Sequence, residues 1–175
     1  MSLARTGRVV HRHPFLHRKR MLRQGSFPVG TIVGMTDISA ETAENEPLVT
    51  DELIEQRVRA IVGRACTRQV WMLFLDRNDV QVPLILPMAD YPESPGNGNA
   101  AIFADRVREI VEVAGAEQVI FVWERYAGDR LNPVDIAWAR HLHEACRTEG
   151  VSVRAQLLSH KRGVRWMAPE DYLAG

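Results

Sequence analysis

The residues best suited to chemistry follow one short apolar run, Val119–Trp123. They are a carboxylate, two guanidinium groups and a Gly-Asp turn: Glu124, Arg125, Gly128, Asp129 and Arg130. A carboxylate beside a bound substrate can act as a general base, and arginine is suited to bidentate contacts with carboxylates or phosphates. Two interpretations therefore stay open for this cluster. It forms a site that binds an anion or a partner, or it is an ordinary charged loop in which a solvent-facing Glu124 pairs with Arg125 or Arg130.

Asp135 is a second candidate, because it stands in the first turn of an expected helix. Asn132 and Pro133 fit the N-cap and the first position of that helix. A carboxylate two residues further on stabilises the free backbone N–H groups by about 0.3–1 kcal/mol. We therefore expect Asp135 to be a capping group, with metal ligation as the alternative.

The histidines do not combine into a site. His141 and His143 are two positions apart on one expected helix, which turns them about 200° from each other. We expect His141 at the surface and His143 packed beside the apolar stripe. His160 is expected in a turn, and the pair it forms with Ser159 lacks the third member of a nucleophilic triad.

Helices and strands are expected to alternate in an α/β fold with a mixed sheet flanked by helices. A helix capped by Thr50 is expected to run to about Cys66, and Val70–Leu75 reads as a strand buried on both faces. The following strand, Val80–Leu86, contains Pro83, which predicts an edge strand or a bulge. The other expected elements are a loop over Tyr91–Asn99, helices from Phe103 to a stop at Gly115 and from Asn132 to a stop at Gly150, and strands Val119–Trp123, Val151–Leu158 and Val164–Met167.

From Thr67 to Met167 this order of elements resembles the RadC-like branch of the JAB/MPN metal-dependent hydrolases. The likeness rests on short motifs in sequence order: Leu73-Phe74-Leu75-Asp76-x-Asn78, Gly128-Asp129, Asn132-Pro133-x-Asp135-Ile136-Ala137, Arg140-x-Leu142-x-Glu144-Ala145 and Gly150-Val151-x-Val153. The resemblance implies a three-layer-like, cytidine-deaminase-like architecture.

The resemblance also implies which groups a catalyst would need. Active members hold zinc with two histidines and an aspartate, and an upstream glutamate activates the zinc-bound water. Trp123 and Arg125 stand at the two histidine positions, the strand Val80–Leu86 has no glutamate, and only Asp135 matches a ligand. We therefore expect no metal, no cofactor and no hydrolase activity, and a binding or scaffolding role instead. The expected binding surfaces are the rim of the former site, Trp123–Arg130 with Asp135, and the basic residues from Arg5 to Arg23. An exposed Trp123 would support recognition, and a buried Trp123 would be a core residue. The alternative is a hydrolase that uses Asp135 with other ligands, or Glu124 as its base.

The N-terminal part of the chain is expected to lie outside the compact domain. Residues 1–24 form a basic arm, residues 25–49 an extended segment with an acidic linker, and residues 50–175 the α/β domain. The arm has no acid among its seven basic residues: Arg5, Arg8, Arg12, Arg18, Lys19, Arg20 and Arg23. It fits self-association or contact with the acidic residues 37–55, a second protein, or nucleic acid through phosphate neutralisation. A DNA-associated protein is therefore a further alternative. His11, His13 and His17 are expected to belong to this arm rather than to a metal site.

Composition favours a cytoplasmic protein. The formal net charge is zero, and the sequence contains neither a run of about 18 uncharged apolar residues nor a secretory leader pattern. We therefore expect no membrane contact. The two cysteines, Cys66 and Cys146, are expected to be buried free thiols rather than a disulfide.

Overall fold

The computed structural model describes residues 45–174, which fold into four helices and five strands. In chain order the elements are α2 (Asp51–Ile61), β1 (Gln69–Leu75), β2 (Gln81–Ala89), α3 (Asn99–Ala114), β3 (Gln118–Glu124), α4 (Pro133–Thr148), β4 (Ser152–His160), β5 (Gly163–Trp166) and α5 (Pro169–Leu173). None of the helices in this range combines the length and the apolar composition that crossing a membrane requires.

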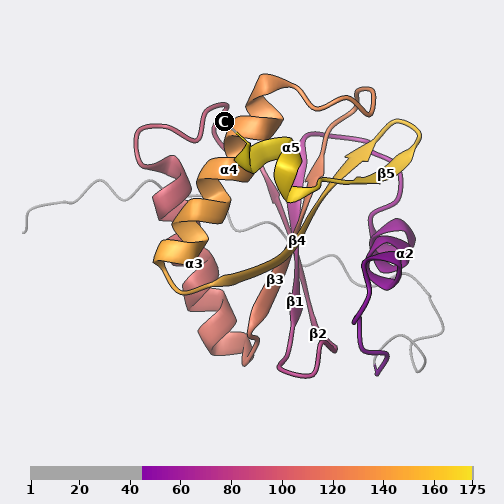
Figure 1. Cartoon of the computed structure of the whole chain (residues 1–175), viewed down its shortest axis with the longest axis vertical. Coiled ribbons are helices and arrows are strands. Elements are labelled where there is room, and N and C mark those ends of the chain that lie inside the picture. The colour runs from indigo at the N-terminus through magenta and orange to yellow at the C-terminus, as the bar shows by residue number, and fades with distance from the viewer. Residues whose placement is uncertain (1–44, 175) are drawn as a thin grey trace, which may run out of the picture.

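The strands form one mixed sheet in the order β2-β1-β3-β4-β5 (Figure 1). β1 is antiparallel to both β2 and β3, whereas β3 and β4 are parallel and β4 returns through a tight turn to β5. The central position of β3 puts its whole length between two neighbours. Because β3 and β4 are parallel, both strands end at the same edge of the sheet.

Helices cover both faces of the sheet, as the sequence predicts (Figure 1). On one face α3, α4 and α5 pack over an aromatic-rich core that includes Phe103, Phe121 and Trp138. On the other face α2 covers a smaller aliphatic core that includes Ile54 and Leu157. β3 contributes to both cores, because alternate side chains of a strand point to opposite faces.

The predicted helix ends are confirmed where the capping residues are strong. The Thr50 hydroxyl accepts a hydrogen bond from the Leu53 N–H at 3.3 Å, and Asn132 caps α4. Gly115 ends α3 in the left-handed conformation with a φ of 66°, which glycine adopts without a steric cost. Gly150, at a φ of 74°, follows α4.

Several boundaries differ from the prediction: α3 begins at Asn99, four residues before Phe103, and the short helix α5 was not expected. The first helix ends at Ile61 rather than near Cys66, because Gly63 takes a φ of 62° and turns the chain back toward the sheet. β2 continues to Ala89, three residues past the predicted end. The Gly63 stop was missed because Ala65 continues the apolar periodicity of the helix.

The start of the described chain is packed against the sheet. Pro47 forms a β-bridge with Val80, the Leu48 N–H donates to the Asp79 carbonyl at 2.8 Å, and the Leu48 side chain is 1% exposed. The expected solvated loop therefore contributes a core residue. Residues 1–44, with the predicted basic arm and most of the extended segment, lie outside the described residues.

The interpretation of Pro83 is confirmed on both counts. β2 is an edge strand of the sheet, and its register with β1 shifts between Leu73 and Leu75. Pro83 and Pro87 have no N–H to donate to a neighbouring strand. Such residues are tolerated in an edge strand such as β2, which has a neighbour on one side only.

Two neighbouring residues of α3 test the face on which this helix packs. Phe103 is 2% exposed in the aromatic core, whereas Ile102 is 40% exposed. We expect Phe103→Ala to lower the free energy of unfolding by about 3–5 kcal/mol, because it leaves a cavity. Ile102→Ala is the matched control, with an expected loss below about 1 kcal/mol. Urea denaturation measures both values, and equal losses would contradict the packing described.

Candidate functional site

The end of β3 separates the candidate residues onto opposite faces of the sheet. Trp123 lies in the aromatic core under α3 and α4, and Arg125 reaches Asp135 at the start of α4 on that same side. Glu124 points the other way, toward the loop between α2 and β1. The stretch Trp123–Arg130 is therefore not one continuous binding surface.

Trp123 is a core residue. Its ring is 2% exposed and contacts Tyr91 and Trp138 with centroid distances of 5.6 and 5.9 Å. Its indole N–H donates to the Gln156 side-chain oxygen at 2.8 Å, and the Gln156 amide donates to the Ala139 carbonyl at 2.9 Å. The polar atom of the indole is therefore satisfied inside the core. Of the two outcomes expected for Trp123, exposed recognition residue or buried core residue, the structure shows the buried one.

The expectation that Glu124 faces the solvent and pairs with Arg125 or Arg130 is wrong. The residue is 3% exposed. Its carboxylate accepts four hydrogen bonds, from the Cys66 N–H at 2.6 Å, the Thr67 N–H at 3.1 Å, the Gln69 amide at 2.6 Å and the Trp71 indole at 2.8 Å. The charged group thereby fastens the loop between α2 and β1 to the end of β3.

The protonation of Glu124 follows from these contacts. Burial by itself raises the pKa of the carboxyl group, but the hydrogen bonds from Cys66, Trp71, Gln69 and Thr67 outweigh it, so the pKa is lowered overall. Glu124 is therefore ionised at neutral pH, with its oxygens occupied. A general base needs an accessible lone pair, which this group does not offer.

Replacing Glu124 tests this clasp. We expect Glu124→Gln to lower the free energy of unfolding at pH 7 by about 1–3 kcal/mol, because the amide cannot accept all four donors. A lowered folded-state pKa gives stability that is present above the ordinary Glu pKa of about 4.3 and is lost as the pH falls through the folded value. Chemical denaturation from pH 7 to pH 3 should therefore show a steeper loss for the wild type than for the variant. Glu117→Gln, an exposed change just before β3, should leave the stability at pH 7 nearly unchanged. Parallel pH curves for wild type and Glu124→Gln would refute the assignment.

Arg125 and Asp135 form a partly buried ion pair where β3 ends and α4 begins. The Arg125 Nε lies 2.9 and 3.1 Å from the two Asp135 oxygens, and the side chains are 16% and 9% exposed. A second Arg125 nitrogen donates to the Arg130 carbonyl. Asp135 also accepts from the Asn132 N–H at 2.8 Å while its own N–H donates to the Asn132 side chain at 2.8 Å. The capping role expected of Asp135 is confirmed.

This arrangement does not fit a zinc ion. Asp135 has a guanidinium against its carboxylate, and a cation there repels a second cation. Trp123 offers no lone pair to a metal. Within residues 45–174 no three His, Cys, Asp or Glu side chains come together as a metal would need.

A double-mutant cycle measures the strength of the Arg125–Asp135 pair. We expect a coupling energy of about 1–3 kcal/mol between Arg125→Met and Asp135→Asn, because the two groups are largely shielded from water. The exposed pair formed by Arg162 and Asp129 is the matched control, with side chains 73% and 46% exposed. Its coupling should be too small to resolve. Coupling of similar size in both pairs would contradict the shielding described.

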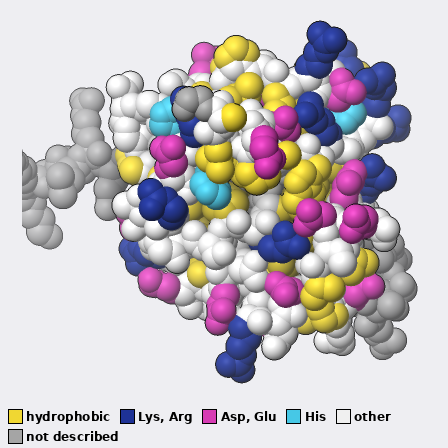
Figure 2. Space-filling view, in the orientation of Figure 1, with side chains coloured by type: hydrophobic (Ala, Val, Ile, Leu, Met, Phe, Trp, Pro, Cys, Tyr) yellow, Lys and Arg dark blue, Asp and Glu magenta, His cyan; other side chains and the backbone are white. Residues whose placement is uncertain are grey.

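The loop after β3 and the β4–β5 turn form one surface. The Lys161 N–H donates to the Ala127 carbonyl at 3.0 Å, Arg162 pairs with Asp129 at 2.7 Å, and Arg165 donates to the Asp129 carbonyl at 3.0 Å. Arg162 lowers the pKa of Asp129 by its charge. Lys and Arg side chains gather at this end of the molecule in Figure 2, at its upper right. The sequence did not single out Lys161 and Arg162, although the parallel β3 and β4 bring their ends together.

The remaining candidates in the loop differ in what they contribute. Gly128 does not have a positive φ, so its backbone does not require glycine. Arg130 is exposed and pairs with no acidic side chain among residues 45–174. Tyr126, which sequence reasoning missed, is 67% exposed, and the Lys161 ammonium lies 4.9 Å from its ring centroid. It is the exposed aromatic of this surface.

The histidines and cysteines have structural positions. His141 is exposed and contacts its own helix through the Ala137 carbonyl, whereas His143 packs against Tyr172 with a ring distance of 5.9 Å, as predicted. His160 is buried at the end of β4, and burial lowers its pKa. The neighbouring Ser159 hydroxyl donates to the Gly63 carbonyl at 2.8 Å, so the pair is not a nucleophile.

Both cysteines are free, as predicted, but only one is buried. Cys146 lies in the core, where burial raises the pKa of its thiol to about 12. Cys66 is exposed, because the first helix ends before it and leaves it in a loop. The expectation of two buried thiols is therefore wrong for Cys66.

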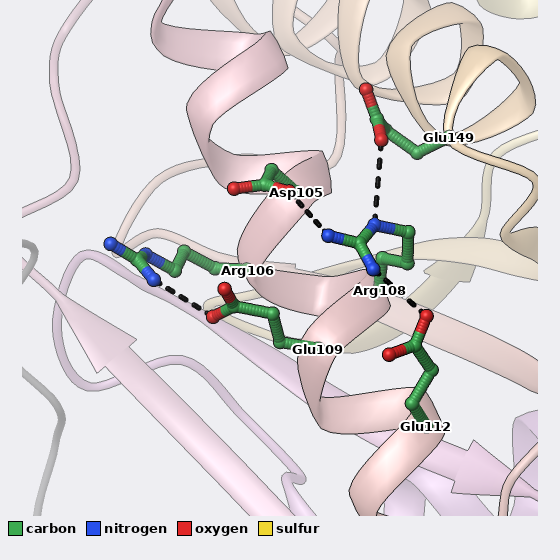
Figure 3. A network of polar contacts seen from close by, with 6 residues as sticks. All are labelled: Asp105, Arg106, Arg108, Glu109, Glu112 and Glu149. Atoms are coloured by element: carbon green, nitrogen blue, oxygen red, sulfur yellow. Dashed lines mark hydrogen bonds and ion pairs between the residues drawn. The ribbon is translucent and has the colours of Figure 1, made fainter.

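A separate charged network joins α3 to the end of α4 (Figure 3). Arg108 lies 2.8 Å from Asp105, 2.8 Å from Glu112 and 3.5 Å from Glu149. These partners are partly or fully exposed, and exposed ion pairs contribute little to stability. The network connects α3 to the end of α4. The Arg108 guanidinium is already engaged by three carboxylates, so it is not available to bind an anionic ligand.

Comparison with known proteins does not place the chain in a family. No protein-family model matches the sequence, and no curated protein matches it. Membership of the RadC-like branch is therefore a proposal.

Proposed function

We propose that residues 45–174 are a catalytically inactive JAB/MPN-like domain that binds or scaffolds proteins through the loop after β3 and the β4–β5 turn. The order of elements supports the fold. A helix precedes the β1–β2 pair, two helix–strand units follow, and a short return strand closes the sheet. From β1 to β5 that order is the one on which the resemblance rests.

The Arg125–Asp135 ion pair carries the functional part of the proposal. The carboxylate that matches a zinc ligand of the family holds a guanidinium at 2.9 Å. Trp123, at a histidine position of the family, fills the adjacent core. An arginine that stabilises Asp135 and the loop carbonyl takes over the positional role of a cation without its Lewis acidity. The proposed site thus keeps the arrangement of strand, loop and helix but lacks a metal ion that would activate water.

The hydrolase alternative loses its two residues to structural contacts. Glu124 accepts four hydrogen bonds on the opposite face of the sheet, and Asp135 is held by Arg125 and Asn132. A hydrolase would need Asp135 or Glu124 released from these contacts and at least two more polar groups directed at the same point.

The DNA-associated alternative depends on residues outside the described part. Residues 1–44 contain seven basic and three acidic side chains, whereas residues 45–174 contain 15 and 19. The described domain thus has a net charge of −4, which disfavours a polyanion as its general partner. We therefore keep protein binding as the proposal.

Zinc titration tests the proposal directly. We expect calorimetry to detect no stoichiometric zinc binding in the wild type that depends on Asp135, because Arg125 competes for the carboxylate. Asp135→Ala should then give the same titration as wild type, and Asp129→Ala is the control from the same loop. One equivalent of zinc in the wild type, lost in Asp135→Ala and kept in Asp129→Ala, would overturn the proposal.

A further inference from the structure

Exposed basic side chains gather at one end of the sheet and several acidic side chains at the other, although both ends carry charges of each sign. At the end where β3 and β4 finish lie the residues that we call the basic end: Arg64, Tyr126, Arg130, Lys161 and Arg162. At the end where β3 begins lie Glu46, Asp76, Asp79 and Glu117, with Arg77 as the base of the same turn. β3 spans the distance between them, from Gln118 to Glu124.

Three acids near the basic end pair with bases, whereas Glu124, at the end of β3, is ionised and held by four uncharged donors. Asp135 pairs with Arg125, Asp129 with Arg162, and Asp171 with Arg165. Asp90 and Glu93 follow β2, which is two strands away from β3. The basic end therefore exposes cations that none of these ion pairs engages.

Three cations at the basic end have no acidic partner among the described residues: Arg64, Arg130 and Lys161. They are joined to one frame, because the Ala65 N–H donates to the His160 carbonyl at 3.1 Å and the Lys161 N–H to the Ala127 carbonyl at 3.0 Å. Tyr126 stands among them, 67% exposed. The Lys161 ammonium lies 4.9 Å from its ring centroid. Tyrosine and arginine are residue types enriched in protein-binding hot spots.

The chain itself contains a matching segment. Residues 37–46 include Asp37, Glu41, Glu44 and Glu46 and no basic residue. Glu46 pairs with Arg57 of its own domain at 3.6 Å, which leaves the first three for another partner. This segment enters the domain at the opposite end of the sheet, because Pro47 is bridged to Val80. Charge complementarity thus pairs the segment with the basic end.

Most of the segment is too short to meet the basic end of its own molecule, although Asp37, ten residues from Pro47, can span up to about 36 Å. Glu44 is three residues from Pro47 and reaches at most about 11 Å, and Glu41 reaches about 22 Å only when the chain is fully extended. β3 alone covers about 20 Å, and the basic end lies beyond its last residue. The glutamates of this segment therefore meet the basic end of a second copy more readily than their own.

We propose that the domain self-associates head to tail, with the acidic segment 37–46 of one copy bound on the basic end of the next. This inference names the partner of the surface in the proposed function and rests on it. Two different surfaces meet, so the contact is heterologous and leaves a free end on each side of a dimer. Because the contact is between charges at the surface, added salt weakens it.

Two neutralising variants of the full chain separate the surfaces. Lys161→Gln/Arg162→Gln removes charge from the basic end, and Glu41→Gln/Glu44→Gln removes it from the segment. Arg106→Gln/Arg147→Gln is the control, with the same loss of charge elsewhere. Sedimentation at low and high salt should show concentration-dependent association of the wild type and of the control at low salt only. Either neutralising variant should weaken association about tenfold or more, because charge-assisted contacts are lost.

Mixing the two neutralising variants gives the sharpest result. Only one intact pair of surfaces exists in the mixture, so we expect a 1:1 dimer and no larger species. A wild type that stays monomeric at low salt, a control that dissociates as the variants do, or a mixture that stays monomeric would overturn head-to-tail association. So would a labelled single-stranded oligonucleotide that binds the wild type and is lost in Lys161→Gln/Arg162→Gln, since it would reassign the basic end to nucleic acid. These results leave the zinc test untouched, so the two proposals can fail separately.

Discussion

The alternation of side chains at the end of β3 determines what this domain can do. Residues 123, 124 and 125 are consecutive, and a strand must send neighbours to opposite faces. Trp123 therefore enters the aromatic core, Glu124 holds the loop between α2 and β1, and Arg125 meets Asp135. Each of the three side chains is thus committed to a structural contact with a different part of the fold. A catalytic group at any of the three positions would have to be released from that contact.

In the proposed function, the Arg125 cation holds the end of β3, the following loop and the start of α4 in place without supplying a Lewis acid. Asp135 completes the cap of α4 and accepts from Arg125, which also holds the Arg130 carbonyl in the loop. One partly buried pair thus joins the central strand, the loop and the next helix. Beside this pair, accessible charged groups lie in the loop after β3 and in the β4–β5 turn, the surface of the proposed protein contact.

The elements could be predicted from sequence because their signals are local. Asn132 and Pro133 mark the start of α4, Gly115 the end of α3, and the apolar runs mark β1 and β3. The environment of Glu124 could not be predicted, because its four donors come from residues 53–58 positions earlier. Proximity of this kind depends on strand pairing, and in the sequence Glu124 has only Arg125 and Arg130 as visible partners. For the same reason the sequence did not indicate that Lys161 and Arg162 lie beside the Tyr126 loop, because the parallel pairing of β3 and β4 brings them together.

A crystal structure of the full chain grown with zinc, with diffraction recorded on both sides of the zinc absorption edge, tests the central claim most directly. The account predicts an Arg125 Nε within hydrogen-bond distance of the Asp135 carboxylate and no anomalous peak beside it. An anomalous peak on Asp135, with the Arg125 side chain turned away and other ligands drawn in, would contradict the account and return the domain to the metal-dependent hydrolases.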